Sequence, residues 1–189
     1  MKNPFVKTAL IGGLAAGVFC FLYLLLLYVI GSNPFGRYKY IYLGLYAIFF
    51  GGALWYFRFK QNGGRLSMGR AIGIGLILNS TATLLYGLLL FIWMLIPGTE
   101  VISRHKNALV ELGKSNVTFI EEQMKVSKEL NDEEAYQNLQ EQKKEVQEVF
   151  EDIKNTELTA GGLAVDQGIG LLFTGMFLTF LTAILFKGK

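Results

Sequence analysis

Four long apolar segments alternate with polar stretches along the chain. They cover residues 8–30, 41–57, 71–96 and 163–186. The hydrocarbon core of a bilayer is about 30 Å thick, and a helix needs about 20 mainly apolar residues to cross it. The pattern therefore predicts four transmembrane helices, of which the second, 41–57, is near the shortest length that spans.

The first apolar segment follows Lys2 and Lys7, as the apolar region of a signal peptide would. Its apolar run has 23 residues, however, and no small-x-small cleavage pattern follows Ile30. We expect a membrane anchor that is retained in the protein.

The polar insert between the third and fourth segments has a helical pattern. Pro97-Gly98 ends the third span, and Thr99 is expected to cap a new helix. An apolar stripe follows at spacings of three and four, and it contains Val101, Ile102, His105, Ala108, Leu109 and Leu112. We expect this helix to end at 113–116.

Two further helix starts are expected in the insert. Thr118 with Glu121 has the spacing of a capping box, and Asn131-Asp132 is a second start signal. The second start precedes a coiled-coil seam of Tyr136, Leu139, Lys143, Val146, Phe150 and Ile153. We expect a helical hairpin whose apolar stripes pack against each other, and a leftover apolar face would bind another protein.

Together these elements predict an all-α polytopic membrane protein: four transmembrane helices with a helical extramembrane hairpin between the third and fourth. The expected parts are 1–98 with three spans, 99–160 as the acidic hairpin, and 161–189 with the fourth span and a short basic tail.

Composition agrees with a membrane protein and excludes several function classes. The chain is 52% hydrophobic, and its mean hydropathy is +0.37, which excludes an ordinary soluble enzyme. A net charge of +3 without a dense basic patch excludes nucleic acid as a partner. With one Cys (Cys20), one His (His105) and no nucleophile beside a base, we expect no disulfide, metal, cofactor or catalytic residue, and hence no enzyme.

Charge is distributed unevenly, and this predicts the orientation. Residues 99–158 hold fourteen acidic and eight basic residues, whereas Asp166 is the only acid elsewhere. Lys and Arg stay on the cytoplasmic side of short loops. Cytoplasmic termini would place eight basic residues there, against Arg37 and Lys39 opposite: Lys2, Lys7, Arg58, Lys60, Arg65, Arg70, Lys187 and Lys189. We expect both termini to be cytoplasmic and residues 99–160 to lie on the other side of the membrane, which is the periplasm if the cell is Gram-negative.

Polar and small residues inside the spans are the candidate functional positions. Asn79 with Thr83 and, nearer a span end, Asp166 serve either helix packing and solvation or a transport path. Pairs of small residues four apart predict close helix packing, within one chain or between chains: Gly13 and Gly17, Ala47 and Gly51, Gly69 and Gly73, Ala164 and Gly168.

The basic turn between the second and third spans contains Arg58, Lys60, Arg65 and Arg70. Two interpretations stay open for it. The charges either only fix the orientation of the spans, or they hold anionic lipid headgroups or a docked partner.

Several short motifs resemble a known family. The opening residues 2–9, the loop 33–38, the turn 63–69 and the long helical insert are together similar to the bacterial membrane family catalogued as domain of unknown function 4199. The resemblance implies a four-span inner-membrane protein of Gram-negative bacteria with no assigned activity. It also implies an accessory role beside a polyprenyl-phosphate glycosyltransferase, because relatives are encoded near such enzymes.

Three function hypotheses follow from the sequence. One of them, an integral enzyme that acts on a lipid through the acidic residues of the insert and the basic turn, is disfavoured because no acid and base pair is recognisable. The first is a non-catalytic accessory or scaffold protein that docks a partner through its hairpin, its basic turn or both. The alternative is a small homo-oligomeric transporter or channel that uses Asp166 and Asn79. The expected partners are the lipid bilayer and either a membrane protein or further copies of this chain.

Overall fold

A computed structural model describes residues 3–186, and all regular structure in this range is helical. Within it the elements follow in the order α1 (Pro4–Val29), η1 (Arg37–Tyr40), α2 (Ile41–Tyr56), η2 (Phe57–Gln61), α3 (Met68–Leu95), α4 (Val101–Glu129), α5 (Glu133–Asn155) and α6 (Ala160–Phe186). The predicted all-α fold class is confirmed.

Four helical segments in the described part of the chain are long and apolar enough to cross a membrane. They are α1, the continuous segment Arg37–Gln61, α3 and α6. The second segment is longer than predicted because the helix continues past Phe57 as η2, a single π-helical turn. Arg58 and Lys60 lie in that turn, so the apolar pattern ends before the helix does.

The chain forms two compact units. One contains the residues up to Thr99 and again from Thr159, and so holds the four candidate spans. The other is Glu100–Leu158, which holds α4 and α5.

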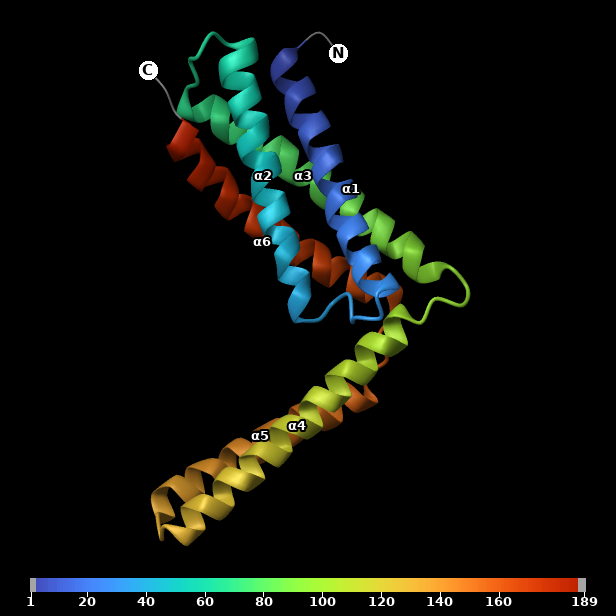
Figure 1. Ribbon diagram of the computed structural model, residues 1–189, viewed down its shortest axis with the longest axis vertical. Coiled ribbons are helices and arrows are strands. Elements are labelled where there is room, and N and C mark those ends of the chain that lie inside the picture. The colour runs from blue at the N-terminus through green and yellow to red at the C-terminus, as the bar shows by residue number, and fades with distance from the viewer. Residues whose placement is uncertain (1–2, 187–189) are drawn as a thin grey trace. The chain divides into compact units, whose positions relative to one another are not determined.

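In the first unit α3 contacts both α1 and α6, and α2 contacts α1 and α6 (Figure 1). The start of α1, the turn after η2 and the end of α6 lie together, and we call this the N-terminal end of the bundle. Phe5 of α1 and Phe57 of η2 meet there edge to face, with ring centroids 6.0 Å apart.

Helices α1 and α3 approach each other through two glycines one turn apart. A Cβ atom added to Gly13 would lie 2.6 Å from the carbonyl oxygen of Leu78. One added to Gly17 would lie 2.8 Å from the carbonyl oxygen of Ala82. Both distances are shorter than real Cβ contacts, so this close backbone approach requires glycine at both positions.

A buried apolar cluster fills the N-terminal end of the bundle. It joins side chains from every element of that region: Ala9, Leu54, Phe57, Leu66, Ala71, Ile74 and Ala183. Leu66 belongs to the turn between η2 and α3 and is fully buried. The turn itself bends at Gly63 and Gly64, whose φ angles of 59° and 81° are left-handed. One buried side chain therefore anchors an otherwise polar turn to the core.

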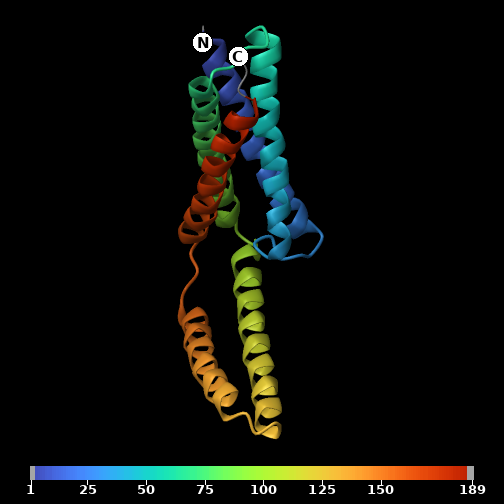
Figure 2. The same ribbon diagram turned by 90° about the vertical axis from the view of Figure 1, so that its left-hand side faces the viewer.

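In the second unit α4 and α5 form an antiparallel hairpin (Figure 2). Lys106 Nζ donates a hydrogen bond of 2.9 Å to the Thr156 carbonyl. Further along α4, Glu121 forms an ion pair with Lys143 at 2.8 Å. Residue numbers thus rise along α4 while they fall along α5, as a hairpin requires.

The predicted helix end at 113–116 is wrong, because α4 is a single helix through these residues. Glycine inside a helix costs about 1 kcal/mol relative to alanine. Here it admits a neighbour, since a Cβ atom on Gly113 would lie 2.5 Å from Cδ2 of Phe150. A contact between helices therefore explains the glycine that the sequence pattern marks as a break.

Two predicted helix caps are also wrong. Thr118 lies within α4, where its hydroxyl donates a 3.0 Å hydrogen bond to the Lys114 carbonyl. The Thr99 hydroxyl donates to the Ile96 carbonyl at 2.9 Å, and Glu100 is the residue that precedes α4. Each threonine bonds backward to a carbonyl, which competes with the forward capping bond.

The predicted helix start at Asn131-Asp132 is confirmed. Asn131 has a left-handed φ of 55°, which turns the chain after α4. Asp132 then caps α5, because its Oδ1 accepts a 3.0 Å hydrogen bond from the Ala135 amide. The predicted seam residues of α5 are all half-buried, and no residue of the described α5 is fully buried.

We predict that Gly13→Ala destabilises the bundle, because its new methyl group would overlap the Leu78 carbonyl. Overpacking of this kind costs about 1–3 kcal/mol. Gly44→Ala is the matched control, since nothing lies within 4 Å of a Cβ atom there. Thermal unfolding of the two purified variants in detergent measures the difference, and equal unfolding temperatures would contradict the close contact.

Candidate functional site

The polar cluster predicted in the third span is a junction of three helices. The buried Asn79 side chain of α3 accepts a 2.6 Å hydrogen bond from the Tyr46 hydroxyl of α2. Its Nδ2 donates a 3.0 Å bond to the Leu172 carbonyl of α6. Thr83 donates to the same Oδ1 at 3.4 Å. The amide oxygen and the amide nitrogen of Asn79 are therefore both bonded to groups inside the bundle.

Glycine on α6 makes room for this junction. Gly175 is buried directly against the Asn79 side chain, and an added Cβ atom would overlap the amide Oδ1. Gly75, one turn before Asn79 on α3, similarly faces Thr179, whose Cγ2 would lie 2.6 Å from an added Cβ. The α3–α6 contact thus combines a buried amide with close backbone approach, which is how polar groups stabilise helix association in membranes.

Asp166 lies near the N-terminal end of α6, away from the Asn79 junction, and has different partners. It is exposed, and its Oδ2 accepts a 3.0 Å hydrogen bond from the neighbouring Gln167. The amide oxygen of buried Gln167 in turn accepts a 3.1 Å bond from Lys39 Nζ of η1. The Gln167 amide therefore bridges a cation from the loop before α2 and the carboxylate at the start of α6.

Lys39 and Gln167 were not singled out as candidate site residues in the sequence. Helical spacing could have identified Gln167, which lies four residues from both Leu163 and Leu171 on the buried stripe of α6. Its partner on η1 was not predictable, because no local pattern indicates which loop reaches α6.

The predicted small-residue pairs divide into two groups. Gly73 meets a neighbour, since an added Cβ atom would lie 2.7 Å from Cζ of Phe5. Gly69 faces open space, and Gly51 and Gly168 have neighbours only at 3.9 Å. The two alanines differ in burial, since Ala164 is buried and Ala47 half-buried. Only part of the small-residue pattern is therefore used for tight packing within this chain.

The basic turn contains two arginines with internal partners. Arg58 donates to the Gly64 carbonyl at 2.8 Å and to the Phe186 carbonyl at 3.1 Å. The positive charge of Arg58 at the Phe186 carbonyl stabilises the C-terminal end of α6, where the helix dipole is negative. Arg70 donates to Asn62 Oδ1 at 3.3 Å, and Asn62 also donates to the Arg65 carbonyl. These bonds hold the turn to itself and to α6.

Lys60 and Arg65 of the same turn have exposed side chains. They are therefore the members of the predicted headgroup or partner-docking set that solvent and lipid can reach most freely. Three further basic residues in the orientation argument, Lys2, Lys187 and Lys189, lie outside the described residues.

The hairpin's seam contains one ion pair between its helices. Lys143, the charged interruption of the predicted seam, is half-buried and bonds Glu121 of α4 at 2.8 Å. This hydrogen bond and the charge of Lys143 lower the pKa of the Glu121 carboxyl. The charged seam position thus pairs across the hairpin.

A line of large apolar side chains remains exposed on α4. Leu112, Phe119 and Val126 are 57%, 60% and 48% exposed, and Leu130 at the helix end is 73% exposed. At 100° per residue these positions lie within about 40° of one another around the helix. We call these four residues the α4 stripe. In contrast to the sequence prediction, Leu112 belongs to this exposed line and not to the buried face.

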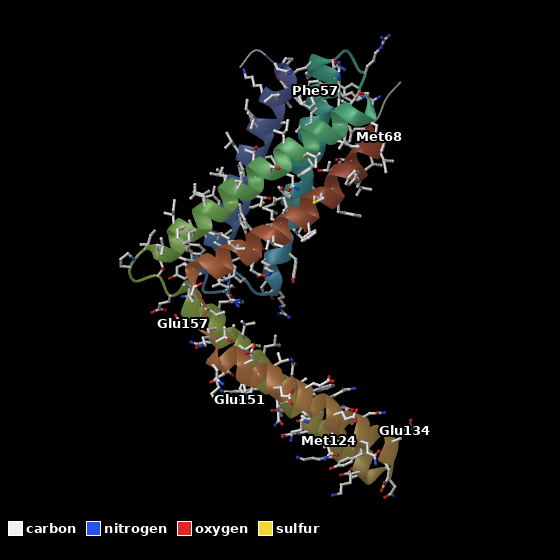
Figure 3. The ribbon with its side chains drawn as sticks, turned by 180° about the vertical axis from the view of Figure 1, so that it is seen from behind. Phe57, Met68, Met124, Glu134, Glu151 and Glu157 are labelled. Atoms are coloured by element: carbon white, nitrogen blue, oxygen red, sulfur yellow. The ribbon has the colours of Figure 1, made fainter. Side chains whose placement is uncertain are left out.

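No group of three His, Cys, Asp or Glu side chains within residues 3–186 is placed to hold a metal ion. His105 is buried and Cys20 is a buried free thiol. Polar side chains crowd the hairpin, as the sticks near Met124, Glu134 and Glu151 illustrate (Figure 3). The described residues therefore offer contact surfaces and structural polar groups as candidate sites.

Comparison with protein families shows which family the chain belongs to. Residues 12–188 match the family described as Protein of unknown function (DUF4199). The chain belongs to this family. The match starts inside α1 and includes α2 to α6, so the bundle and the hairpin are both parts of the DUF4199 region. The comparisons with curated proteins and with solved structures give no match.

We predict that Asn79→Ala loosens the contacts of α3 with α2 and α6. The variant loses two hydrogen bonds between helices, each worth about 0.6–2 kcal/mol in a membrane protein. Ser80→Ala is the control, because Ser80 is adjacent but exposed. Unfolding in mixed micelles with rising dodecyl sulfate measures the change. A variant as stable as the Ser80→Ala protein would contradict the proposed junction.

We further predict that Lys143→Met raises the pKa of Glu121 toward that of an ordinary glutamate, whereas Lys144→Met does not. The lowered pKa means that ionised Glu121 stabilises the folded hairpin above its unfolded-state pKa. This contribution is lost as the pH falls through the folded-state pKa. Carboxyl carbon chemical shifts followed through an acid titration measure both variants, and equal titration curves would refute the pairing.

Proposed function

We propose that this DUF4199 protein is a non-catalytic accessory or scaffold protein of the membrane, and that its hairpin docks a partner protein. The observation that carries the proposal is the α4 stripe. Large apolar side chains aligned over several turns of a charged helix are costly to leave in water, and such patches mark interaction sites.

The geometry of the stripe fits a partner helix. Leu112 to Val126 extends over about 21 Å at 1.5 Å per residue, which is the length of a typical docked helix. Anchors one or two turns apart on one face are the pattern by which amphipathic helices are bound. Because residues 99–158 have a net charge of −6, we expect basic residues beside the apolar face of the partner.

Beside the stripe, the hairpin's own seam has a shallow groove of about 290 Å³. Phe150 and Ile153 of α5 line it, together with Leu109 and Leu112 of α4. The predicted coiled-coil character of this seam is part of the proposal. In it, α4 and α5 form a two-helix unit that a further helix completes on the side of the stripe.

In this proposal the orientation rests on the charge distribution, and the bacterial inner membrane rests on the family resemblance. We infer a bacterial inner membrane with both termini in the cytoplasm and residues 99–160 in the periplasm. The basic turn would then face the cytoplasm, where Lys60 and Arg65 offer a second docking surface. A polyprenyl-phosphate glycosyltransferase is the partner class that the family resemblance implies.

The alternative, a homo-oligomeric transporter that uses Asp166 and Asn79, receives less support from the geometry. The Asn79 amide is bonded to three other groups inside one chain. Asp166 bonds Gln167 and is exposed near the start of α6. A transport path would need these groups to exchange such bonds for a substrate.

The test is purification of the full chain from its own membrane in a mild detergent. We predict a stoichiometric second protein that Phe119→Ser reduces by about tenfold or more, as expected for loss of an aromatic anchor. Gln147→Ser is the control, since Gln147 on α5 is also exposed but lies outside both the stripe and the groove. Equal retention of the partner by both variants would contradict docking at the α4 stripe.

Two further outcomes of this purification separate the alternatives. If the partner is retained after deletion of residues 99–158, the docking surface lies instead at the basic turn. A complex containing only copies of this chain would contradict the accessory role and support the transporter hypothesis.

A further inference from the structure

Two apolar grooves lie on either side of α1 near the N-terminal end of the bundle. The first, of about 630 Å³, lies between α1 and α2. The second, of about 420 Å³, lies between α1 and Thr81 of α3. Lys7 and Ile11 line both grooves, so one lysine stands at the point that the two grooves share.

The first groove changes from polar to apolar along its length. Lys7, Thr8 and Gln61 line it near the start of α1, where Thr8 donates a 2.9 Å hydrogen bond to Gln61 of η2. Its other lining is mainly apolar or small, and includes Ala15 of α1 and Gly52 of α2. A lipid molecule has the same distribution of polarity, with a polar headgroup at one end and apolar chains along the rest.

The length of the groove suits one leaflet. Lys7 and Ala15 are about 12 Å apart along a helix that rises 1.5 Å per residue, whereas one leaflet contributes about 15 Å of hydrocarbon. Beyond Ala15, the rings of Phe19 and Phe49 meet with centroids 5.3 Å apart and join α1 to α2. The groove therefore starts at a cation near a span end and stops near the middle of the span.

The charge of Lys7 is available to a ligand. Its side chain is exposed and makes no hydrogen bond or ion pair with any residue from 3 to 186. Neither groove is lined by a carboxylate. An anionic headgroup at Lys7 would thus meet an unopposed positive charge at the membrane boundary.

We propose that these grooves bind one anionic diacyl phospholipid. Its phosphate contacts the Lys7 ammonium, and its two acyl chains lie on either side of Ile11, one in each groove. Two apolar grooves that share one cation match a lipid with two chains and one headgroup. This site is separate from the α4 stripe and from Lys60 and Arg65, and it does not depend on the proposed accessory function.

The experiment is native mass spectrometry of the full chain, released from detergent after titration with phosphatidylglycerol or phosphatidylcholine. We expect one phosphatidylglycerol to be retained at least fivefold more than phosphatidylcholine. Lys7→Gln should abolish that preference. Arg37→Gln, which removes an exposed charge outside both grooves and outside the basic turn, should leave it unchanged.

A second pair of variants tests the groove itself. Gly52→Leu fills the first groove, and it should reduce retention of both lipids at least fivefold. Nothing lies within 4 Å of a Cβ atom at Gly52, so the helix can accept the larger side chain. Gly44→Leu is the matched control on α2, since it also meets open space.

Three results would overturn the proposal. The first is a headgroup preference that survives Lys7→Gln. The second is an equal loss of preference in Arg37→Gln, which would assign binding to general basic charge. The third is equal lipid retention by Gly52→Leu and Gly44→Leu.

Discussion

The Asn79 side chain joins three of the four spanning helices, and the architecture of the bundle depends on it. A buried amide has no water to bond with inside a bilayer, so its partners must come from the protein. Tyr46 of α2 and the Leu172 carbonyl of α6 supply them. Gly175 allows α6 to approach closely enough for this bond to form. Close glycine contacts at Gly13 and Gly17 then hold α1 against α3 in the same way.

The two parts of the chain use their polar and apolar side chains differently. The buried amides of Asn79 and Gln167 join separate helical elements of the bundle, while the lipid-facing side chains are apolar, as Leu84 and Phe173 show with 74% and 66% exposure. The hairpin has the opposite character, because it is acidic and yet leaves apolar side chains exposed in one line. This difference supports the proposal that the hairpin binds another protein while the bundle anchors the chain in the membrane.

The sequence predicted those properties that depend on local pattern. The spans followed from apolar length, and the start of α5 followed from Asn131 and Asp132. The predicted caps at Thr99 and Thr118 failed because each hydroxyl bonds backward to a nearby carbonyl, and other predictions failed where a distant residue matters. Gly113 has the pattern of a helix end, but it lies within α4, where its missing side chain leaves room for Phe150 across the hairpin. The bridge from Lys39 through Gln167 to Asp166 joins residues 128 positions apart, and no local spacing indicates it.

The central claim is that the hairpin contacts a different protein through the α4 stripe. A photocrosslinking amino acid placed at position 119 on the α4 stripe, in the full chain in its own membrane, tests this directly. The same group at position 84 on the lipid-facing side of α3 provides the comparison. The account predicts a single adduct with another protein from position 119 and none from position 84. Adducts that contain only a second copy of this chain, or partner adducts from position 84 alone, would contradict it.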